Sequence, residues 1–124
     1  PTELPWRELT LDQALAVAQE NNQRVFIDFT GKDCIECKYM ETRMARRWPR
    51  VRQQLENLVL AKLYTDRRTD QDNANKELLL KRFESAGPPF YAILNSNGDT
   101  LAEFSGGTRQ EEDFLAFINQ AVNP

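Results

Sequence analysis

Two cysteines are the residues with the clearest chemistry in this sequence. Cys34 and Cys37 are the only cysteines among its 124 residues, and two residues separate them. Two thiols at this spacing can close a small disulfide ring and open it again, which is the basis of thiol–disulfide exchange. A structural disulfide in so short a ring would stabilise the fold little, because the entropic gain grows with the length of the closed loop. The pair therefore indicates a redox-active site.

The composition argues against most other kinds of site. The chain has no histidine, which excludes His-based triads, His general bases and His metal ligands. A zinc site takes about four Cys or His ligands, so these two cysteines do not complete one. The aspartates at 66, 70 and 72 lack the glycine and the terminal glutamate of a calcium loop. We therefore expect no metal and no organic cofactor, the redox centre being the Cys34–Cys37 disulfide itself.

One acidic residue interrupts the apolar segment that precedes the cysteines. Asp28 stands within residues 24–29, a near-continuous apolar run typical of a strand buried on both faces. An ionised carboxylate is costly in such a place, so burial should raise its pKa and let it exchange a proton with Cys37. The alternative is a solvent-facing aspartate on a half-exposed strand.

Apolar periodicity and turn residues predict the elements that would position these side chains. Helical spacing predicts helices over about 11–21, 34–47, 73–85 and up to 122, with another opening at Pro49. Apolar runs predict strands over about 24–29, 58–64, 90–94 and 100–104.

Short motifs mark several of the predicted element ends. Asn97-Gly98 predicts a hairpin between the last two strands, and Thr108 with Glu111 fits a capping box at the start of the last helix. Strands separated by helices form parallel crossovers, and the hairpin adds an antiparallel edge. The order predicts an α/β fold with a central mixed sheet flanked by helices and an N-terminal helical extension.

The bulk properties are those of an ordinary globular domain. The chain is 40% hydrophobic and 28% charged, with a net charge of −3. This charge argues against a nucleic-acid-binding protein, which would be basic. No apolar run approaches the roughly 20 residues that span a bilayer, so we expect no direct membrane insertion. We expect residues 1–124 to be one domain and a monomer. The start at Pro1 without a signal peptide suits a domain excised from a longer protein, or a mature exported one.

The sequence also resembles the thioredoxin fold over about residues 6–122. It is most similar to the C-terminal thioredoxin-like domain of DsbD-type transmembrane thiol reductases and to related exported thioredoxin-like proteins. The stretches that carry the resemblance are Val25-Phe26-Ile27-Asp28-Phe29, Cys34-Ile35-Glu36-Cys37-Lys38, Met40-Glu41, Leu60-Ala61-Lys62-Leu63-Tyr64-Thr65-Asp66, and Gly87-Pro88-Pro89 running into Phe90-Tyr91-Ala92-Ile93-Leu94.

The resemblance implies a role for each residue of the site. Cys34 would be the nucleophile, its thiolate favoured by a helix N-terminus. Cys37 would resolve the mixed disulfide, and Asp28 matches the buried acid of the family. Pro89 resembles the cis-proline that faces the cysteines, with Pro88 as the alternative cis residue, and Pro88 has no N–H to offer a substrate strand.

The residues around the cysteines would contact substrate and tune the thiol. Ile35, Glu36 and Asp33 lie beside them. The family usually has tryptophan directly before the first cysteine, where this chain has Asp33. Asp33 and Glu36 disfavour a thiolate, and we expect Lys32 and Lys38 to offset them only in part. We hypothesise a modestly acidified Cys34 and a disulfide that is hard to reduce. The alternative is that these are merely solvated surface charges.

A basic cluster follows the cysteines. It comprises Arg43, Arg46, Arg47, Arg50 and Arg52. Because cations are favoured near a helix C-terminus, we interpret it as a solvated helix end in preference to a dedicated anion site.

The predicted function is that of a thiol–disulfide reductase working outside the cytoplasm. By resemblance, electrons would arrive from a membrane electron-donor domain and leave through Cys34 to oxidised periplasmic proteins, including cytochrome c maturation factors. The protein would be periplasmic, or tethered to the inner membrane through a preceding domain. The alternatives are a disulfide isomerase or oxidase on the same fold, and a non-enzymatic docking module that keeps its cysteines for structure.

Overall fold

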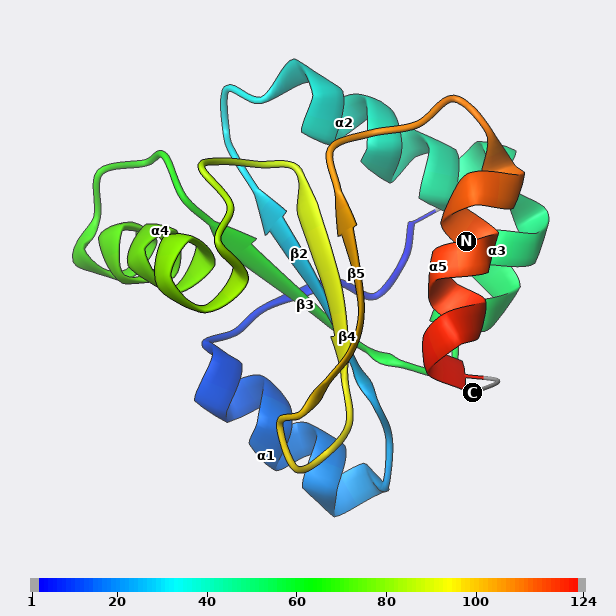
Figure 1. Ribbon diagram of the computed structural model, residues 1–124, viewed down its shortest axis with the longest axis horizontal. Coiled ribbons are helices and arrows are strands. Elements are labelled where there is room, and N and C mark those ends of the chain that lie inside the picture. The colour runs from blue at the N-terminus through cyan, green and yellow to red at the C-terminus, as the bar shows by residue number, and fades with distance from the viewer. Residues whose placement is uncertain (1–2, 123–124) are drawn as a thin grey trace.

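The computed structural model describes residues 3–122, which form a single sheet with helices packed around it (Figure 1). In chain order the elements are β1 (Arg7–Glu8), α1 (Leu11–Asn21), β2 (Val25–Thr30), α2 (Ile35–Thr42), the π-helical turn η1 (Arg43–Arg47), α3 (Pro49–Leu55), β3 (Val59–Tyr64), α4 (Asp70–Phe83), β4 (Phe90–Leu94), β5 (Thr100–Ser105) and α5 (Glu111–Val122).

The sheet is mixed, with the strand order β1-β3-β2-β4-β5. β3 is parallel to β1 and β2, whereas β4 is antiparallel to β2 and β5. The predicted α/β architecture with an antiparallel hairpin edge is therefore confirmed. Thr30 pairs with Tyr64, and Phe29 pairs with Phe90. The ends of β2 and β3 and the start of β4 consequently meet at one edge of the sheet.

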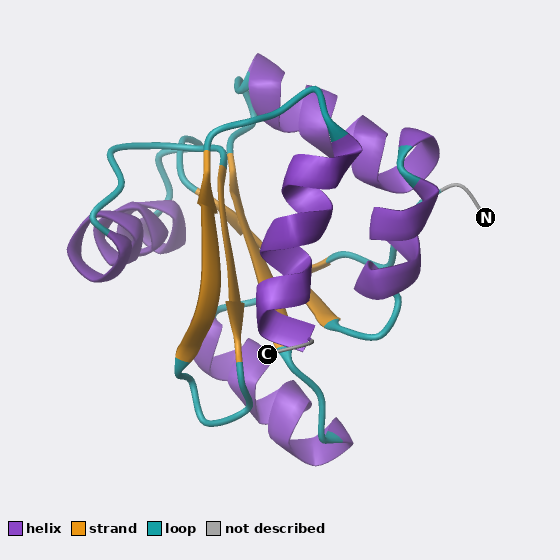
Figure 2. Cartoon of the chain, turned by 45° about the vertical axis from the view of Figure 1, so that its right-hand side comes forward, coloured by secondary structure: helices purple, strands orange, loops and turns teal. Residues whose placement is uncertain are grey.

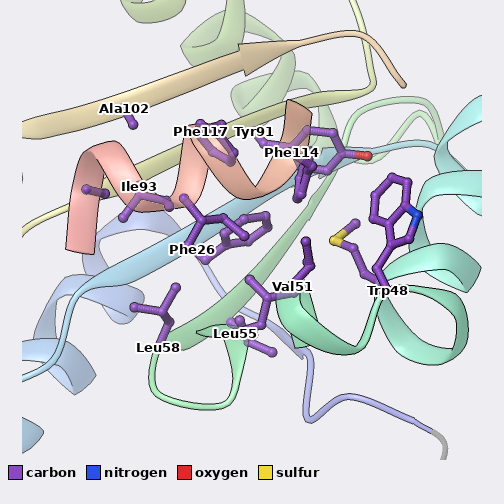
Figure 3. Close-up of a cluster of buried hydrophobic side chains, with 14 of the residues drawn as sticks. Phe26, Trp48, Val51, Leu55, Leu58, Tyr91, Ile93, Ala102, Phe114 and Phe117 are labelled. Atoms are coloured by element: carbon purple, nitrogen blue, oxygen red, sulfur yellow. The ribbon is translucent and has the colours of Figure 1, made fainter. Parts of the chain in front are cut away.

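Helices cover both faces of the sheet (Figures 1 and 2). On one face, α2, η1, α3 and α5 enclose a core in which Phe26 contacts Tyr91, Phe114 and Phe117 (Figure 3). On the other face, α1 and α4 pack on Val25, Ile27 and Phe29 of β2. None of the helices within residues 3–122 is both long and apolar enough to cross a bilayer.

The side chains of β2 alternate between these two cores, as a strand requires. Phe26 faces the α2 side, and Ile27 and Phe29 face the other. Asp28, two residues after Phe26, therefore faces the helices that follow the cysteines. Its position follows from the strand's period of two, which is why a sequence pattern could reveal it.

One predicted helix boundary was wrong. α4 begins at Asp70 instead of about 73, because Thr69 caps it and its Oγ1 accepts a hydrogen bond from the Asp72 N–H at 3.0 Å. The helix predicted over about 34–47 does end at Arg47, but its last turn, η1, is π-helical, with the Trp48 N–H donating to the Arg43 carbonyl at 2.9 Å. The predicted start of α3 at Pro49 is confirmed.

The capping box expected at Thr108 and Glu111 does not form. The Thr108 hydroxyl accepts from the Gln110 N–H. Glu111 instead accepts from the Arg50 N–H at 2.9 Å and the Val51 N–H at 3.3 Å. These amides open α3, so the carboxylate that was expected to cap its own helix caps a neighbouring one. Helix N-termini favour such an anion.

Candidate redox site

Cys34 and Cys37 form a disulfide at the N-terminus of α2, with their Cα atoms 5.2 Å apart. Cys34 is the N-cap residue, and its Sγ accepts a hydrogen bond from the Cys37 N–H at 3.1 Å. Cys34 is half-buried, whereas Cys37 is fully buried. A helix N-terminus stabilises negative charge, so the sulfur that an external reactant can reach is also the one placed to carry it.

Asp66 holds the loop that carries the first cysteine. Its two carboxylate oxygens accept from the Lys32 N–H at 2.7 Å and the Asp33 N–H at 3.0 Å. These hydrogen bonds, chiefly the one from Asp33, lower the pKa of Asp66. A Cβ at Gly31 would lie 2.8 Å from an Asp66 oxygen, so glycine is needed for this close approach. Sequence reasoning missed Asp66, although it follows the strand end that meets Thr30.

Asp28 lies fully buried beneath these cysteines' helix, on the sheet face that α2 covers. Neither carboxylate oxygen accepts a hydrogen bond from a donor group within residues 3–122, and the side chain within its reach is another acid, Glu41. Burial raises the pKa of Asp28 well above its ordinary value, and the nearby charge of Glu41 raises it further. The structure thus excludes the alternative of a solvent-facing aspartate and confirms the predicted burial.

The neighbours of Asp28 form a small ionisable group. In the sheet Asp28 pairs with Lys62 on β3 and Tyr91 on β4. Lys62 Nζ donates to Glu41 at 3.2 Å, and the Thr30 hydroxyl donates to the same carboxylate at 2.9 Å. Lys62 is therefore bound to Glu41, and its charge only partly offsets the raised pKa of Asp28.

Sequence reasoning did not assign Glu41 to the site. The signal was available, because Glu41 stands four residues after Cys37 on the same helix face. The buried Tyr91 hydroxyl also lacks a partner within residues 3–122, and its pKa is raised by burial and by Asp28.

Pro88 and Pro89 lie across from the disulfide. The peptide bond between them is cis, which makes Pro89 the cis residue as predicted. The Gly106 N–H donates to the Pro89 carbonyl at 2.9 Å. Pro88 lines a pocket of about 380 Å³ together with Asp33 and Cys34. The structure thus brings together two predicted parts of the site that are more than fifty residues apart in the sequence.

Glu36 is neutralised by a residue that sequence reasoning missed. Arg109 Nη1 binds both Glu36 oxygens, at 3.0 and 3.2 Å, and its guanidinium stacks 3.8 Å from the centre of the Tyr39 ring. Arg109 thus adds a cation to Lys32 and Lys38, which were the only ones expected to offset the acids around the cysteines. Arg109 comes from the loop before α5, and nothing in the local sequence indicates the pairing.

The other predicted contact residues are accessible. Asp33 is exposed and Ile35 is 84% exposed, although it is a large apolar side chain. No group of three or more Cys, Asp or Glu side chains suited to a metal ion occurs within residues 3–122.

Together these features define a dithiol–disulfide site on a thioredoxin fold. The family model for thioredoxin-like proteins matches residues 6–96. The chain therefore belongs to the thioredoxin-like family of thiol–disulfide oxidoreductases.

Known proteins similar to this chain include a thiol:disulfide interchange protein. The thiol:disulfide interchange protein DsbD of Ralstonia nicotianae is 33% identical over 112 residues, which cover 90% of this chain but only 18% of that protein. The chain thus spans less than a fifth of this relative's length.

Solved structures with the same fold include a thioredoxin and a DsbD domain. A thioredoxin from Thermus thermophilus has a TM-score of 0.75 at 26% identity, over 98% of this chain and 88% of that one. The oxidised C-terminal domain of Neisseria meningitidis DsbD has a TM-score of 0.63 at 24% identity, over 87% of this chain and 89% of that one.

Proposed function

We propose that this protein is a thiol–disulfide reductase that passes two electrons from the Cys34–Cys37 dithiol to disulfides of other proteins. One observation carries the proposal. A half-buried Cys34 caps a helix, while its fully buried partner Cys37 lies on the helix that covers the orphaned carboxylate of Asp28. This arrangement separates the sulfur that attacks from the sulfur that resolves.

The reaction has two exchange steps. The Cys34 thiolate attacks one sulfur of a substrate disulfide, and the other substrate sulfur leaves as a thiolate that takes up a proton. Cys37 then attacks the Cys34 sulfur, releasing the second substrate thiol and closing the disulfide seen here. Asp28, whose pKa burial raises, accepts the Cys37 proton as that thiolate forms.

The charges near Cys34 favour reduction of substrate over oxidation. Asp33 is exposed beside Cys34, and the pocket that both line also contains Asp66 and one cation, Lys76, so acids outnumber cations there. Negative charge disfavours a thiolate, which makes the dithiol less stable relative to its disulfide than in a strong oxidant. This reasoning favours a reductase over an oxidase on the same fold.

The likeness to DsbD supports an extracytoplasmic setting. In that setting electrons reach this domain from a membrane electron-donor domain, and oxidised periplasmic proteins, including those that serve cytochrome c biogenesis, accept them. Around the disulfide, the substrate contacts the remaining residues of the site, which are Pro88, Pro89, Ile35, Glu36 and Asp33.

Two experiments test the proposal. In glutathione redox buffers we expect a potential below roughly −200 mV, whereas a value near the −120 mV of DsbA would contradict a reductase. In an extract of oxidised proteins, Cys37→Ser should trap mixed disulfides and the matched Cys34→Ser should trap none. Absence of adducts with Cys37→Ser would indicate a docking module instead of an enzyme.

A further inference from the structure

A groove of about 370 Å³ runs along the helix that begins at the disulfide. Its lining residues are Ile35, Lys38, Tyr39, Thr42, Arg43 and Arg47. The lining contains three cations and no acid, although the whole chain carries a net charge of −3. The exposed Ile35, one residue from Cys34, forms its apolar end. The groove thus joins an apolar contact at the reacting sulfur to a positively charged track.

The three cations of this groove differ from the other arginines of the basic cluster. Arg46 pairs with Glu3, and Arg50 pairs with Glu111 and Glu112. Within residues 3–122, Lys38, Arg43 and Arg47 form no ion pair. Arg46 and Arg50 are therefore paired within the fold, whereas Arg43 and Arg47, which line the groove with Ile35, keep their charge available.

Two structural features arrange these cations along one track. The Tyr39 ring lies 4.4 Å from the Arg43 guanidinium and 3.8 Å from that of Arg109, so it fixes Arg43 against the helix. Arg109 itself is neutralised by Glu36. The π-turn η1 widens the helix after Thr42, and Arg47 lines the same groove as Ile35. Such turns occur frequently at functional sites.

We propose that this cationic groove docks an acidic segment of the partner protein whose disulfide exchanges with Cys34. The inference rests on the proposed exchange function and names its partner class. An apolar partner side chain packs on Ile35, and carboxylates face Lys38, Arg43 and Arg47. The helix from Ile35 to Arg47 rises about 18 Å, which an extended segment spans in about five residues. The acidic residues therefore lie within about six positions of the partner's cysteine.

The geometry favours a protein partner over an anionic lipid surface. Recognition of anionic lipid generally uses clusters of about four to eight basic residues, whereas this groove presents three. The track also begins directly at the reacting cysteine, where a partner's disulfide must lie. Opposite charge across such an interface raises the association rate and selects the partner.

The test compares three synthetic peptides that share one intramolecular disulfide. Each carries three glutamates, three glutamines or three lysines within six residues of a cysteine, in separate N- and C-flanking versions. The glutamates either precede or follow the cysteine, and we compare the version that reacts faster. With the reduced protein at low salt, we expect this glutamate peptide to react at least about tenfold faster than the lysine peptide of the same arrangement. About 0.5 M salt should abolish most of the difference. Mass spectrometry of quenched reactions gives the rates.

Variants locate the effect on the groove. Arg43→Glu/Arg47→Glu should remove or invert the preference, whereas Arg7→Glu/Arg24→Glu, with the same change in net charge, should keep it. Turnover of the neutral 2-hydroxyethyl disulfide should be equal in all three proteins. Its absence in the wild type would overturn the proposed function itself.

Other outcomes overturn only the docking inference. They are equal rates for all peptides, an equal loss in both double variants, or groove-dependent sedimentation with anionic phospholipid vesicles without any peptide preference. The last result would assign the groove to a membrane surface.

Discussion

Asp28 and Asp72 are both fully buried carboxylates, yet their surroundings give them opposite properties. Asp72 accepts hydrogen bonds from Arg67 Nη2 at 2.7 Å and Nε at 2.9 Å, and from the Thr69 hydroxyl at 3.0 Å. These partners, Arg67 above all, lower its pKa to about 2. No N–H or O–H group within residues 3–122 donates to Asp28, and burial, together with the neighbouring Glu41 carboxyl, raises its pKa. Burial alone therefore does not decide the charge of a carboxylate; its partners do.

The difference separates a structural acid from a candidate catalytic one. Arg67 also binds Glu8 at 2.9 Å and lies 4.1 Å from the Tyr64 ring centre. Through Arg67, Asp72 therefore connects the start of α4 to β1 and β3. Asp28 connects no elements in this way, and it destabilises the fold whenever it is ionised. A costly group without a structural role, placed beneath the helix that carries the cysteines, is typical of a functional site.

The largest expected effect is on stability when the structural acid is removed. Asp72→Asn should lower the free energy of unfolding by about 2–3 kcal/mol at neutral pH. This lies just below the usual cost of breaking a buried ion pair, because Arg67 is partly exposed and can rehydrate. Urea denaturation measures it.

The pH dependence of Asp72 has a definite sign. Its pKa in the fold, about 2, lies below the ordinary Asp value. The stabilisation is therefore present above about pH 4 and is lost as the pH falls through about 2. A change below about 0.5 kcal/mol in Asp72→Asn at neutral pH would contradict the structural role.

The second prediction is that removing the other acid, Asp28, stabilises the fold. Asp28→Asn should raise the free energy of unfolding by about 1–2 kcal/mol near pH 8, because an ionisable group without partners is removed from the core. The pKa of Asp28 is raised, so wild-type stability from this group is complete below about pH 4 and is lost as the pH rises toward the raised value. The gain should accordingly vanish near pH 4. A gain of equal size at all pH values would contradict this account.

The contrast between these acids also explains what the sequence could reveal. Asp28 stood out because it interrupts an apolar run, and the period of a strand is a local pattern. The burial of Asp72 left no such signal, since its neighbours on α4 are mostly polar and its burial depends on Arg67 from the preceding loop. The four longer strands and the placement of the cysteines at a helix start were likewise predictable from local patterns and from family resemblance. The two-residue strand β1 (Arg7–Glu8) was not predicted, because so short a segment carries no alternating pattern.

The contacts that escaped prediction join distant parts of the chain. Glu36 and Arg109 are 73 residues apart, and Glu111 caps a helix 61 residues before it. Charged residues such as these have many equivalent partners in a sequence, and only the packed fold selects one. The edge of the sheet could still have indicated Asp66, because the ends of parallel neighbours meet there.

The third prediction distinguishes the two acids by activity. Asp28→Asn should slow the release of substrate from the mixed disulfide about tenfold, because Cys37 loses its proton acceptor. Single-turnover release of substrate thiol measures this step. The matched Asp72→Asn protein, assayed well below its melting temperature, should retain the wild-type rate. Equal slowing in both variants would show that the effect comes from loosened structure and not from proton transfer.

The smallest effect concerns the ion pair that sets the environment of Asp28. Glu41→Gln removes a negative charge that raises the pKa of Asp28 and frees Lys62 to lower it further. Lys62→Met removes the positive charge that lowers this pKa and leaves Glu41 in place. The two substitutions break the same ion pair, yet they should shift the pKa of Asp28 in opposite directions, with changes in stability below about 1 kcal/mol.

Carboxyl carbon NMR titration of Asp28 measures both shifts, and the same variants made with Asp28→Asn identify its signal. Shifts of the same sign would mean that the broken ion pair merely loosens α2 over the sheet. Opposite signs would show that the Glu41 and Lys62 charges act on Asp28 directly. The difference between the two buried acids would then come down to the partner of one cation. Arg67 is bound directly to Asp72, whereas Lys62, which neighbours Asp28, is bound to Glu41.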